Sequence, residues 1–371
     1  MENYQICTRC IMDTTDPEIS FDEKGVCNHC HHFDEAKKRY EFEDREKELN
    51  RVIDEIKQAG KEKEYDCILG ISGGVDSAYL AYLAKQLGLR VLAVHVDCGW
   101  NSEIAVSNIQ KLCTKLGYDL HTIVVDWETI KELQRAYMFS GLPNLDIPQD
   151  HAFLTATYEY GRKHHIKYML NGSNLATEGI LPHKWGYDAK DFTAIQDVYK
   201  KCGRGKISLA KYPHMNVPKY FQLQYGNEIT RVNLLNYVDY SKKKAIELLS
   251  KEFDWHYYGG KHFESRFTKF FQSYYLPKKF GYDKKRAHLS SLIVGGEMTR
   301  EEALKEMDDT SAYTEAEMLE DRDYILKKLD ISLEEWDEIM NAPCKTEDDY
   351  KNYKKTMERL RKVKHMLKGD R

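Results

Sequence analysis

The sequence predicts an α/β protein: a doubly wound parallel sheet, preceded by a short cysteine-rich segment and followed by a mostly helical region. Three observations predict it. Four cysteines stand in two pairs within the first 34 residues, apolar runs alternate with helical periodicity over residues 66–175, and helix-capping patterns recur after residue 241. Such alternation is typical of parallel strands joined by crossover helices, with ligands bound beyond the carboxyl ends of the strands. Strands are expected at 67–71, 91–97, 122–125 and 168–170, and helices at 78–87, 102–116 and 153–164.

Composition limits the function classes. With 371 residues the chain has room for two or three domains, and its formal net charge of −4 gives no overall attraction to nucleic acid or to a membrane surface. No apolar run approaches the ~18 residues of a membrane span, and the N-terminus lacks the pattern of a signal peptide. Nine cysteines in a chain without export signals favour a reducing compartment. We therefore expect a cytoplasmic protein without membrane insertion, and nucleic acid is not the expected partner.

The N-terminal segment, residues 1–34, contains two Cys-x-x-Cys pairs separated by sixteen residues. Two such pairs at this spacing are typical of a zinc ribbon with four thiolate ligands, and a segment this short needs a metal for its stability. Four thiolates leave no open coordination position, so the metal would be structural. Redox-active or free thiols are the alternative. The predicted Zn²⁺ ligands are Cys7, Cys10, Cys27 and Cys30.

The first predicted strand is followed by the stretch Ser72-Gly73-Gly74-Val75-Asp76-Ser77, which opens a helix. A turn of this kind presents backbone N–H groups and the positive end of a helix dipole to one point, which makes an anion site. Asp76 is an acid where phosphate would bind, so its favourable role is to hold Mg²⁺. The loop lacks the Gly-Lys-Ser/Thr end of a Walker A loop, and an ordinary strand–turn–helix corner is the alternative.

This stretch resembles the Ser-Gly-Gly-x-Asp-Ser signature of the PP-loop ATP pyrophosphatases. The resemblance implies a fold of that type, with ATP cleaved between its α and β phosphates and a carbonyl oxygen adenylylated. It also implies that the turn holds the ATP phosphates and that residues after the second and fourth strands complete the nucleotide site. Carried over by position, the adenosine side would be His95, Val96 and Asp97, and the phosphate side Gly172, Ser173 and Asn174.

Four segments are expected along the chain: the ribbon at 1–34, a helical linker at 35–64, a nucleotide-binding domain at 65–240, and a helical substrate or partner region at 241–371. Apolar residues at helical spacing between 49 and 56 predict the linker helix. Residues 176–240 are expected to be irregular. The basic run at 200–206 would clasp a phosphate or form a solvated loop, and Lys184 stands in a similar loop.

The C-terminal region is predicted to be helical. One helix is expected to start at Ser241, and a basic helix is expected from Lys351. Three capping boxes are expected between them, at Thr299/Glu302, Thr314/Glu317 and Ser332/Glu335. Residues 259–267 combine a Gly-Gly turn with a histidine, an acid and an arginine. In an extended segment, His262, Glu264 and Arg266 would share one face and line an acceptor site, with His262 or Glu264 accepting a proton. Lys285, Arg286 and His288 would support them. The alternative is a buried polar network that only docks the C-terminal helices.

Beyond the PP-loop, the whole pattern is similar to the N-acetyl sugar amidotransferase family of bacterial lipopolysaccharide (O-antigen) and pseudaminic-type acid pathways. The residues that carry this resemblance are the ribbon, the stretch around Trp100 and Asn101, the block 259–267 and the block 285–290. It implies an enzyme that converts the acetamido group of a nucleotide-linked sugar to an acetamidino group, with Trp100, Asn101 and Lys184 near the sugar. It also implies that a separate glutaminase and a cyclase-like barrel supply ammonia, since none of the nine cysteines stands in a glutaminase motif.

Two other functions remain open at this point. A tRNA-modifying PP-loop enzyme, either a thiolase or a lysidine-type ligase, would also adenylylate a carbonyl oxygen, and the basic C-terminus keeps this alternative. A zinc- and nucleotide-binding scaffold without catalysis is the other, and the complete Ser72–Ser77 motif argues against it.

Overall fold

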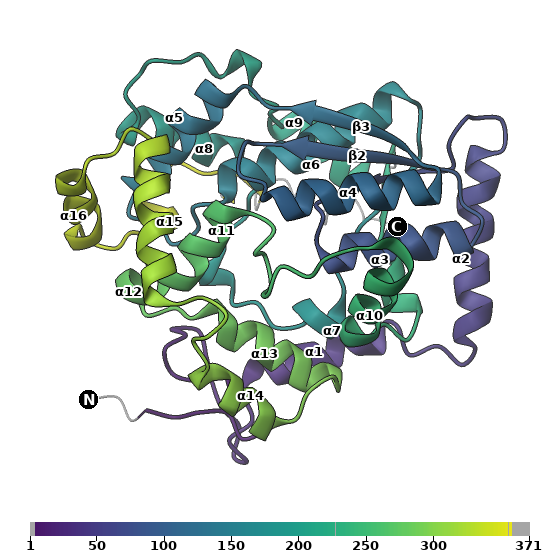
Figure 1. The fold of residues 1–371 in the computed structure, drawn as a ribbon, viewed down its shortest axis with the longest axis horizontal. Coiled ribbons are helices and arrows are strands. Elements are labelled where there is room, and N and C mark those ends of the chain that lie inside the picture. Colours follow the sequence, from purple (N-terminus) through teal and green to yellow (C-terminus); the bar gives the residue numbers. More distant parts are fainter. Residues whose placement is uncertain (1–3, 227, 355, 358–371) are drawn as a thin grey trace, which may run out of the picture.

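The sheet that organises the fold has five parallel strands in the order β3-β2-β1-β4-β5. Figure 1 shows β2 and β3 side by side above α4. This computed structural model describes residues 4–226, 228–354, 356 and 357. The strand order changes direction between β1 and β4, so the carboxyl ends of these two strands form a topological switch point where ligands bind. The strands are β1 Cys67–Gly70, β2 Val91–Asp97, β3 Asp119–Val124, β4 Tyr168–Leu170 and β5 Thr230–Val232.

Helices cover both faces of the sheet, as a doubly wound fold requires. Because successive strand side chains point to opposite faces, alternate residues join different cores. Ile68 and Val94 pack in the core beneath α5, α6 and α8. Leu69 and Ala93 pack in the core beneath α2, α3, α4 and α10. The helices through β5 are α1 Asn28–Lys38, α2 Arg45–Gly60, α3 Val75–Gln86, α4 Glu103–Leu116, α5 Trp127–Met138, α6 Ile147–Lys163, α7 Leu175–Glu178, α8 Phe192–Cys202 and α9 Val217–Tyr225, with short 3₁₀ turns at His183–Trp185 and Leu209–Lys211.

The predicted fold class is confirmed, and β2 and β4 have the predicted bounds. One helix that the sequence did not predict, α5, begins after Asp126, whose carboxylate accepts the N–H of Thr129. Helix α6 starts six residues earlier than expected, with Pro148 in its first turn, a position that tolerates proline because the N–H there has no helical partner.

The expectation that residues 176–240 are irregular is wrong. Asp191 caps α8 and Asn216 caps α9, which also has a proline in its first turn. In the predicted basic run at 200–206, Lys200 and Lys206 are exposed, while the other two cations form internal pairs. Lys201 Nζ lies 2.6 Å from a carboxylate oxygen of Asp197, and Arg204 Nε donates to Glu132 at 2.9 Å.

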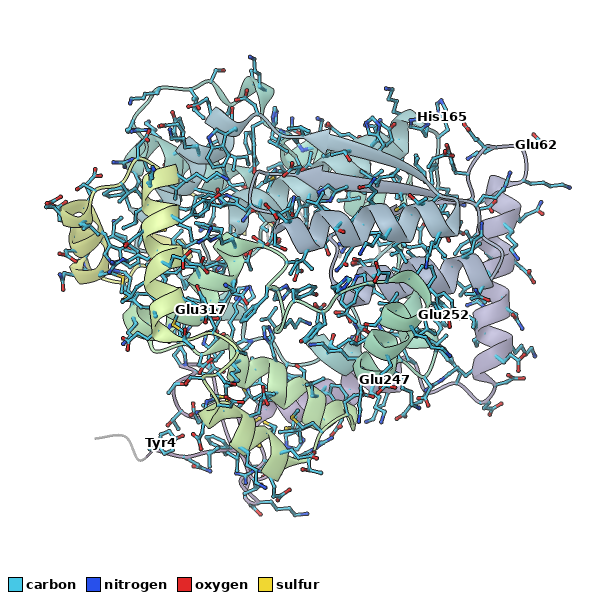
Figure 2. The ribbon with its side chains drawn as sticks, viewed as in Figure 1. Tyr4, Glu62, His165, Glu247, Glu252 and Glu317 are labelled. Atoms are coloured by element: carbon cyan, nitrogen blue, oxygen red, sulfur yellow. The ribbon has the colours of Figure 1, made fainter. Side chains whose placement is uncertain are left out.

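The C-terminal region is helical, as predicted, and the three expected capping boxes form. Helix α10 is amphipathic: it buries Leu249 and Phe253 while Glu247 and Glu252, labelled in Figure 2, are exposed. Most of the basic run from Lys351 lies outside the described residues. The elements are a 3₁₀ turn at Leu234–Tyr237, α10 Lys242–Phe253, α11 Arg266–Phe270, a π-helical turn at Phe271–Tyr275, α12 Leu276–Phe280, α13 Lys284–Gly295, α14 Arg300–Asp308, α15 Glu315–Lys328, α16 Leu333–Asn341 and a 3₁₀ turn at Glu347–Asp349.

The N-terminal segment docks on α13 and α14, where Figure 1 shows α1 beside them at the bottom of the view. Arg286 on α13 donates to the carbonyl oxygen of Ile11 at 2.7 Å, and Arg300 on α14 donates to that of Cys10 at 3.0 Å. Ile11 packs with Leu289 in the apolar contact between them. The N-terminal segment is therefore held by the C-terminal region. None of the described helices has the length and apolar character to cross a membrane.

Candidate active site

The loop after β1 has the geometry of an anion site. Gly73 has φ +83°, and a Cβ there would lie 2.8 Å from the carbonyl oxygen of Ala105, so the position requires glycine. Ser72 Oγ accepts the N–H of Gly74 at 3.2 Å, and Ser77 Oγ donates to the carbonyl of Gly74 at 3.1 Å. A Cβ on Gly172, after β4, would lie only 3.3 Å from the amide nitrogen of Ser77. The two loops predicted to hold phosphate therefore meet at the switch point.

A histidine network orders the end of β2. His95 Nδ1–H donates to the carbonyl oxygen of Ile71 at 2.9 Å, because a carbonyl can only accept. That fixes the tautomer, and Nε2 accepts from the Asn101 side chain at 3.1 Å. Asn101 also donates to Asp97 at 3.0 Å. His95 and Asp97, at the end of β2, thus form one polar group with Asn101.

These groups border a cavity of about 540 Å³ whose opposite wall comes from the C-terminal region. The backbone joins the two walls: Ser102 N–H donates to the carbonyl of Glu264 at 2.8 Å, and Arg266 N–H donates to that of Trp100 at 3.0 Å. Of the residues predicted to bind or react, the cavity is lined by Ser72, His95, Val96, Trp100, Asn101, Ser173, His262, Glu264 and His288.

Asp76 lies in the first turn of α3, close to a buried lysine. Its carboxylate accepts from the Tyr240 hydroxyl at 2.5 Å and from Thr177 Oγ1 at 3.3 Å. Lys261 Nζ lies 3.8 Å from Asp76 and 3.0 Å from Glu178. Burial lowers the pKa of Lys261, but the charges of Glu178 and Asp76 outweigh burial and leave the pKa above its ordinary value. Lys261 is therefore a cation held beside the phosphate loop.

Glu264 extends toward the same loop. A Cβ on Gly74 would lie 3.1 Å from Glu264 Oε1, while Glu264 Oε2 is buried without a hydrogen-bond partner among the described residues. Burial raises the pKa of Glu264, but His262, 3.7 Å away, outweighs it and the net pKa is below the ordinary value. An ionised carboxylate with an unpaired oxygen beside a phosphate loop fits a Mg²⁺ ligand.

The extended conformation expected for residues 262–266 is wrong. Residues 261–264 form turns, His262 has φ +64°, and Arg266 begins α11. Arg266 therefore points to α15, where its guanidinium bonds to Asp321 and lies 3.9 Å from the ring centre of Tyr324. The structure thus places Arg266 in a helix-to-helix contact rather than in the cavity lining.

Three further predicted substrate-binding residues lie elsewhere. Lys184 is on the surface, 3.8 Å from Glu18. Lys285 donates to backbone carbonyls at the end of α14, including that of Asp309 at 2.7 Å. Arg286 holds the N-terminal segment through the carbonyl oxygen of Ile11, a role that the sequence analysis did not consider. Gly172 and Asn174 adjoin the phosphate loop without lining the cavity, and Asn174 caps α7.

Sequence reasoning missed a pair of carboxylates, Asp146 and Asp150, at the start of α6. Both line the cavity, as does Lys284 from α13. Burial and the charge of Asp150 raise the pKa of Asp146 to about 8, and burial raises the pKa of Asp150 to about 6. The side chain of Asp150 is exposed to the cavity, whereas that of Asp146 is buried. The one local signal is Pro148, which favours the first turn of a helix.

The raised pKa of Asp146 makes the stability of the protein depend on pH. The unfolded state loses this proton near pH 4, whereas the folded state keeps it until about pH 8, so stability should fall as pH rises between these values. Asp146→Asn keeps an acceptor for Gln149, which donates at 2.6 Å. The variant should gain on the order of 2 kcal/mol relative to wild type between pH 5 and pH 8 in denaturant unfolding. The exposed Asp337→Asn is the control, and parallel pH profiles for Asp146→Asn and wild type would contradict the prediction.

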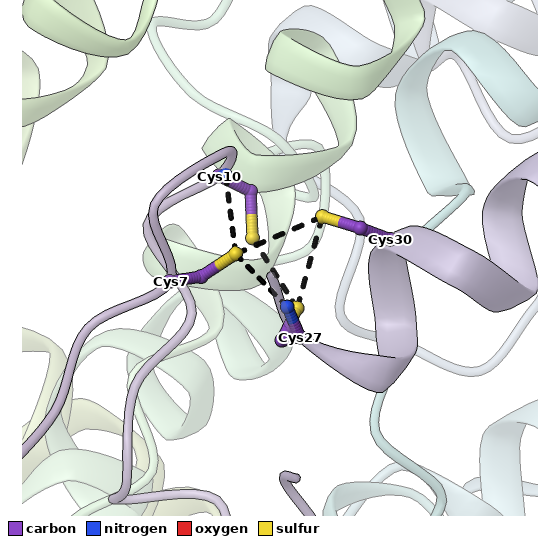
Figure 3. Close-up of side chains that lie close together, drawn as sticks. All are labelled: Cys7, Cys10, Cys27 and Cys30. Carbon is purple, nitrogen blue, oxygen red and sulfur yellow. Dashed lines mark hydrogen bonds between the residues drawn. The ribbon is translucent and has the colours of Figure 1, made fainter. Parts of the chain in front are cut away.

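The four N-terminal cysteines form a buried cluster (Figure 3). Their sulfur atoms all lie within 4.8 Å of one another, and the N–H of Cys27 points to Cys7 Sγ at 3.2 Å. Convergent thiols with backbone N–H donors around them form a candidate metal site. As predicted, Cys7, Cys10, Cys27 and Cys30 lie together.

Comparison with known families covers both halves of the chain. Residues 47–223 match the NAD synthase family, and residues 264–364 match a family described as "LPS biosynthesis protein WbpG-like, C-terminal domain". The chain therefore resembles both families, each over less than half of its length. The second match begins at Glu264, the residue that extends over the phosphate loop, so the cavity lies where the two matched regions meet.

Individual relatives are similar over shorter stretches. A tRNA(Ile)-lysidine synthase from Chlamydia pneumoniae is 32% identical over 90 residues, covering 21% of this chain and 28% of that protein. The tRNA-specific 2-thiouridylase of Yersinia pestis is 34% identical over 93 residues, 22% of this chain and 25% of that protein. This chain thus spans about a quarter of the length of these relatives. An NH₃-dependent NAD synthetase structure from Campylobacter jejuni is 18% identical with a TM-score of 0.29, covering 57% of this chain and 94% of that one.

Proposed function

We propose that this protein is an ATP-dependent amidotransferase of lipopolysaccharide biosynthesis. It would adenylylate the acetamido carbonyl oxygen of an N-acetylated sugar and replace that oxygen with ammonia, giving an acetamidino group. The observation that carries the proposal is the shared cavity, because the anion site of the PP-loop region faces His262, Glu264 and His288 of the C-terminal region. An ATP-activating loop thereby shares one chamber with residues of the WbpG-like region.

The reaction has two steps. In the first, the amide oxygen forms a bond to the α-phosphorus of ATP, and the bond to the β-phosphate oxygen breaks, releasing pyrophosphate. In the second, ammonia nitrogen bonds to the imidate carbon, the C–O bond breaks with AMP as the leaving group, and the nitrogen loses a proton. The loop amides and Lys261 would stabilise the departing pyrophosphate. Asp76 and Glu264 would hold Mg²⁺, which supplies further positive charge there.

The proton acceptor is assigned to the Asp146–Asp150 pair rather than to Glu264. Proton transfer is most efficient when the pKa of the base lies near the working pH, and the raised values of both aspartates meet this condition. Glu264 is held ionised by His262 and is better suited to bind a metal. His262 would then position Glu264.

The function is tested by pyrophosphate release. Purified protein with ATP, Mg²⁺ and ammonium salt should release pyrophosphate only when an N-acetylated sugar or sugar nucleotide is added, and the product should be one mass unit lighter. Release that depends on tRNA instead would replace this proposal by the tRNA-modifying one. ATP binding without turnover, whatever acceptor is added, would indicate the scaffold.

Ammonia would come from a separate glutaminase, assembled with a cyclase-like barrel. The thiols support this, because burial raises the pKa of Cys98 and Cys113, which disfavours a nucleophilic thiolate at either position. Ammonium alone should therefore sustain slow amidine formation, and glutamine should do so only once a glutaminase is added. Efficient use of glutamine by this chain alone would refute the proposal.

We propose Zn²⁺ for the cysteine cluster. The sulfur–sulfur distances of 3.7, 3.7 and 3.9 Å match the ~3.8 Å that tetrahedral zinc with ~2.3 Å bonds requires. An iron–sulfur cubane binds each thiolate to a different iron and holds the sulfurs further apart. Elemental analysis of protein purified without chelator should give one zinc per chain. Iron with inorganic sulfide, or far less than one zinc, would contradict the assignment.

A further inference from the structure

A second cavity of about 400 Å³ lies directly beside the first, on the side of α13 and α14. Four side chains line both cavities and so form the wall between them: Lys261, Gln272, Lys284 and His288. Gln272 is in the π-helical turn, a distortion that occurs often at functional sites. Nothing in the proposed reaction uses this second chamber.

The wall between the cavities is positively charged. Lys242, from α10, adds a third lysine on the side of the second cavity. Among the described residues, Lys242 and Lys284 form no ion pair; their ammonium groups lie 5.7 Å from the ring centres of Tyr257 and Phe271, respectively. Burial lowers the pKa of both lysines, and the charges of nearby acids offset this only in part, so a bound anion would favour the charged form of each lysine.

The pKa of His288 is sensitive to the positive charge of this wall. Burial lowers its pKa well below the ordinary value, and the charges of Lys261, His262, Lys284 and Lys242 lower it further. His288 is therefore a neutral imidazole that can donate to, or accept from, a ligand passing between the chambers.

Two of the acids on the rim of the second cavity are already engaged. Asp283 accepts the backbone N–H of Lys285 at 2.9 Å, and Asp309 accepts that of Ser311 at 2.8 Å. Glu306 is the third carboxylate there, and the backbone carbonyl oxygen beside it accepts from Lys285. The lysines on the shared wall thus face a chamber in which two of the three carboxylates already accept hydrogen bonds from backbone N–H groups.

The remaining walls are aromatic and rich in methionine. Such surfaces fit a flat ring, because aromatic faces stack and thioethers adapt to irregular shapes. These residues come from the segment before α11, from α13, α14 and α15, and from the connections before α14 and α15: Tyr257, Phe263, Leu289, Leu292, Met298, Met307, Tyr313 and Met318.

We propose that the second cavity binds the nucleoside diphosphate carrier of the acceptor sugar. The diphosphate would lie against Lys242 and Lys284, the base would lie on the aromatic and methionine wall, and the sugar would pass His288 into the reaction chamber. A volume of about 400 Å³ suits one small ligand and not a long polyprenyl chain, which favours a nucleoside over a lipid diphosphate. The proposal rests on the proposed function for the identity of the sugar, but not for the anion site itself.

The test measures binding of UDP and GDP by calorimetry, with the phosphate loop saturated by α,β-methylene-ATP. Lys242→Met should weaken binding at least about tenfold, since it removes a charge-assisted contact, and Lys242→Arg should restore most of it. Lys243→Met is the matched control, because this neighbouring lysine on α10 is exposed, and it should change binding less than about twofold. Uridine should bind far more weakly than UDP.

Farnesyl diphosphate distinguishes the two sources of a diphosphate. Tighter binding of farnesyl diphosphate than of UDP would overturn the nucleoside assignment, and equal effects of Lys242→Met and Lys243→Met would overturn the site. In steady-state assays Lys242→Met should raise KM for a UDP-linked N-acetyl sugar about tenfold and leave that for the unlinked sugar unchanged. If UDP binding depends on Lys242 but no sugar causes pyrophosphate release, the result would support the subsite and contradict the proposed function.

Discussion

Asp76→Asn should lower acceptor-dependent pyrophosphate release at least about a thousandfold while leaving the free energy of unfolding close to wild type. The asparagine carbonyl can still accept from Tyr240, and Lys261 keeps its 3.0 Å contact with Glu178, so the local packing survives. What disappears is the negative charge in the first turn of α3 that would hold Mg²⁺ with Glu264. Asparagine is a weaker ligand for this hard cation than a carboxylate.

The control for Asp76→Asn is Asp239→Asn, which makes the same chemical change at a fully exposed aspartate next to Tyr240. That variant should retain wild-type rates. Raising the Mg²⁺ concentration should rescue Asp76→Asn in part if the defect is metal affinity. Wild-type turnover in Asp76→Asn at low Mg²⁺ would remove Asp76 from the mechanism.

Cys7→Ser is expected to have the largest effect on folding. Removing one of four ligands should abolish tight metal binding, and a segment that depends on a metal for its stability should then unfold. Because the segment packs on α13, which carries Lys284 and His288 into the cavity, turnover should fall with the metal content. Far-UV circular dichroism, zinc content and activity measured on the same preparation check this.

Cys344→Ser is the matched control, since Cys344 is exposed and far from the cluster in sequence. It should keep full metal content and activity. A Cys7→Ser protein with normal zinc content and a normal melting transition would show that the cluster is a set of ordinary thiols.

The parts of this protein that follow from local chemistry were predictable. Runs of apolar residues gave β1, β2 and β4, whereas β3 begins three residues before the expected range and β5 was not predicted. The Ser72–Ser77 stretch specified its own turn, because Gly73 needs a positive φ and Ser72 and Ser77 bond within the loop. The capping boxes after residue 298 are equally local, since Thr or Ser and Glu three residues apart satisfy each other.

The parts that depend on distant partners were not predictable. Arg266 has the composition of a substrate ligand, but Asp321 lies fifty-five positions further along the chain and binds it. Asp146 and Asp150 became candidates only when the fold placed them in a cavity opposite Lys284. Helix α8 is different, because the cap at Asp191 and the helical spacing of Phe192, Ile195, Val198 and Tyr199 were local signals that the sequence analysis passed over.

The contact between the N-terminal segment and α13 sets an order of events during synthesis. Ile11 N–H donates to Ser290 Oγ across 279 positions of sequence. At ~5–20 residues per second, the ribosome makes α13 roughly a quarter of a minute to a minute after the cysteines emerge. The cysteines can therefore bind metal long before their docking surface exists, and Ile11 waits exposed until then. A nascent chain stalled before α13 would carry a loaded metal site with an uncovered apolar face, a substrate for chaperones rather than an enzyme.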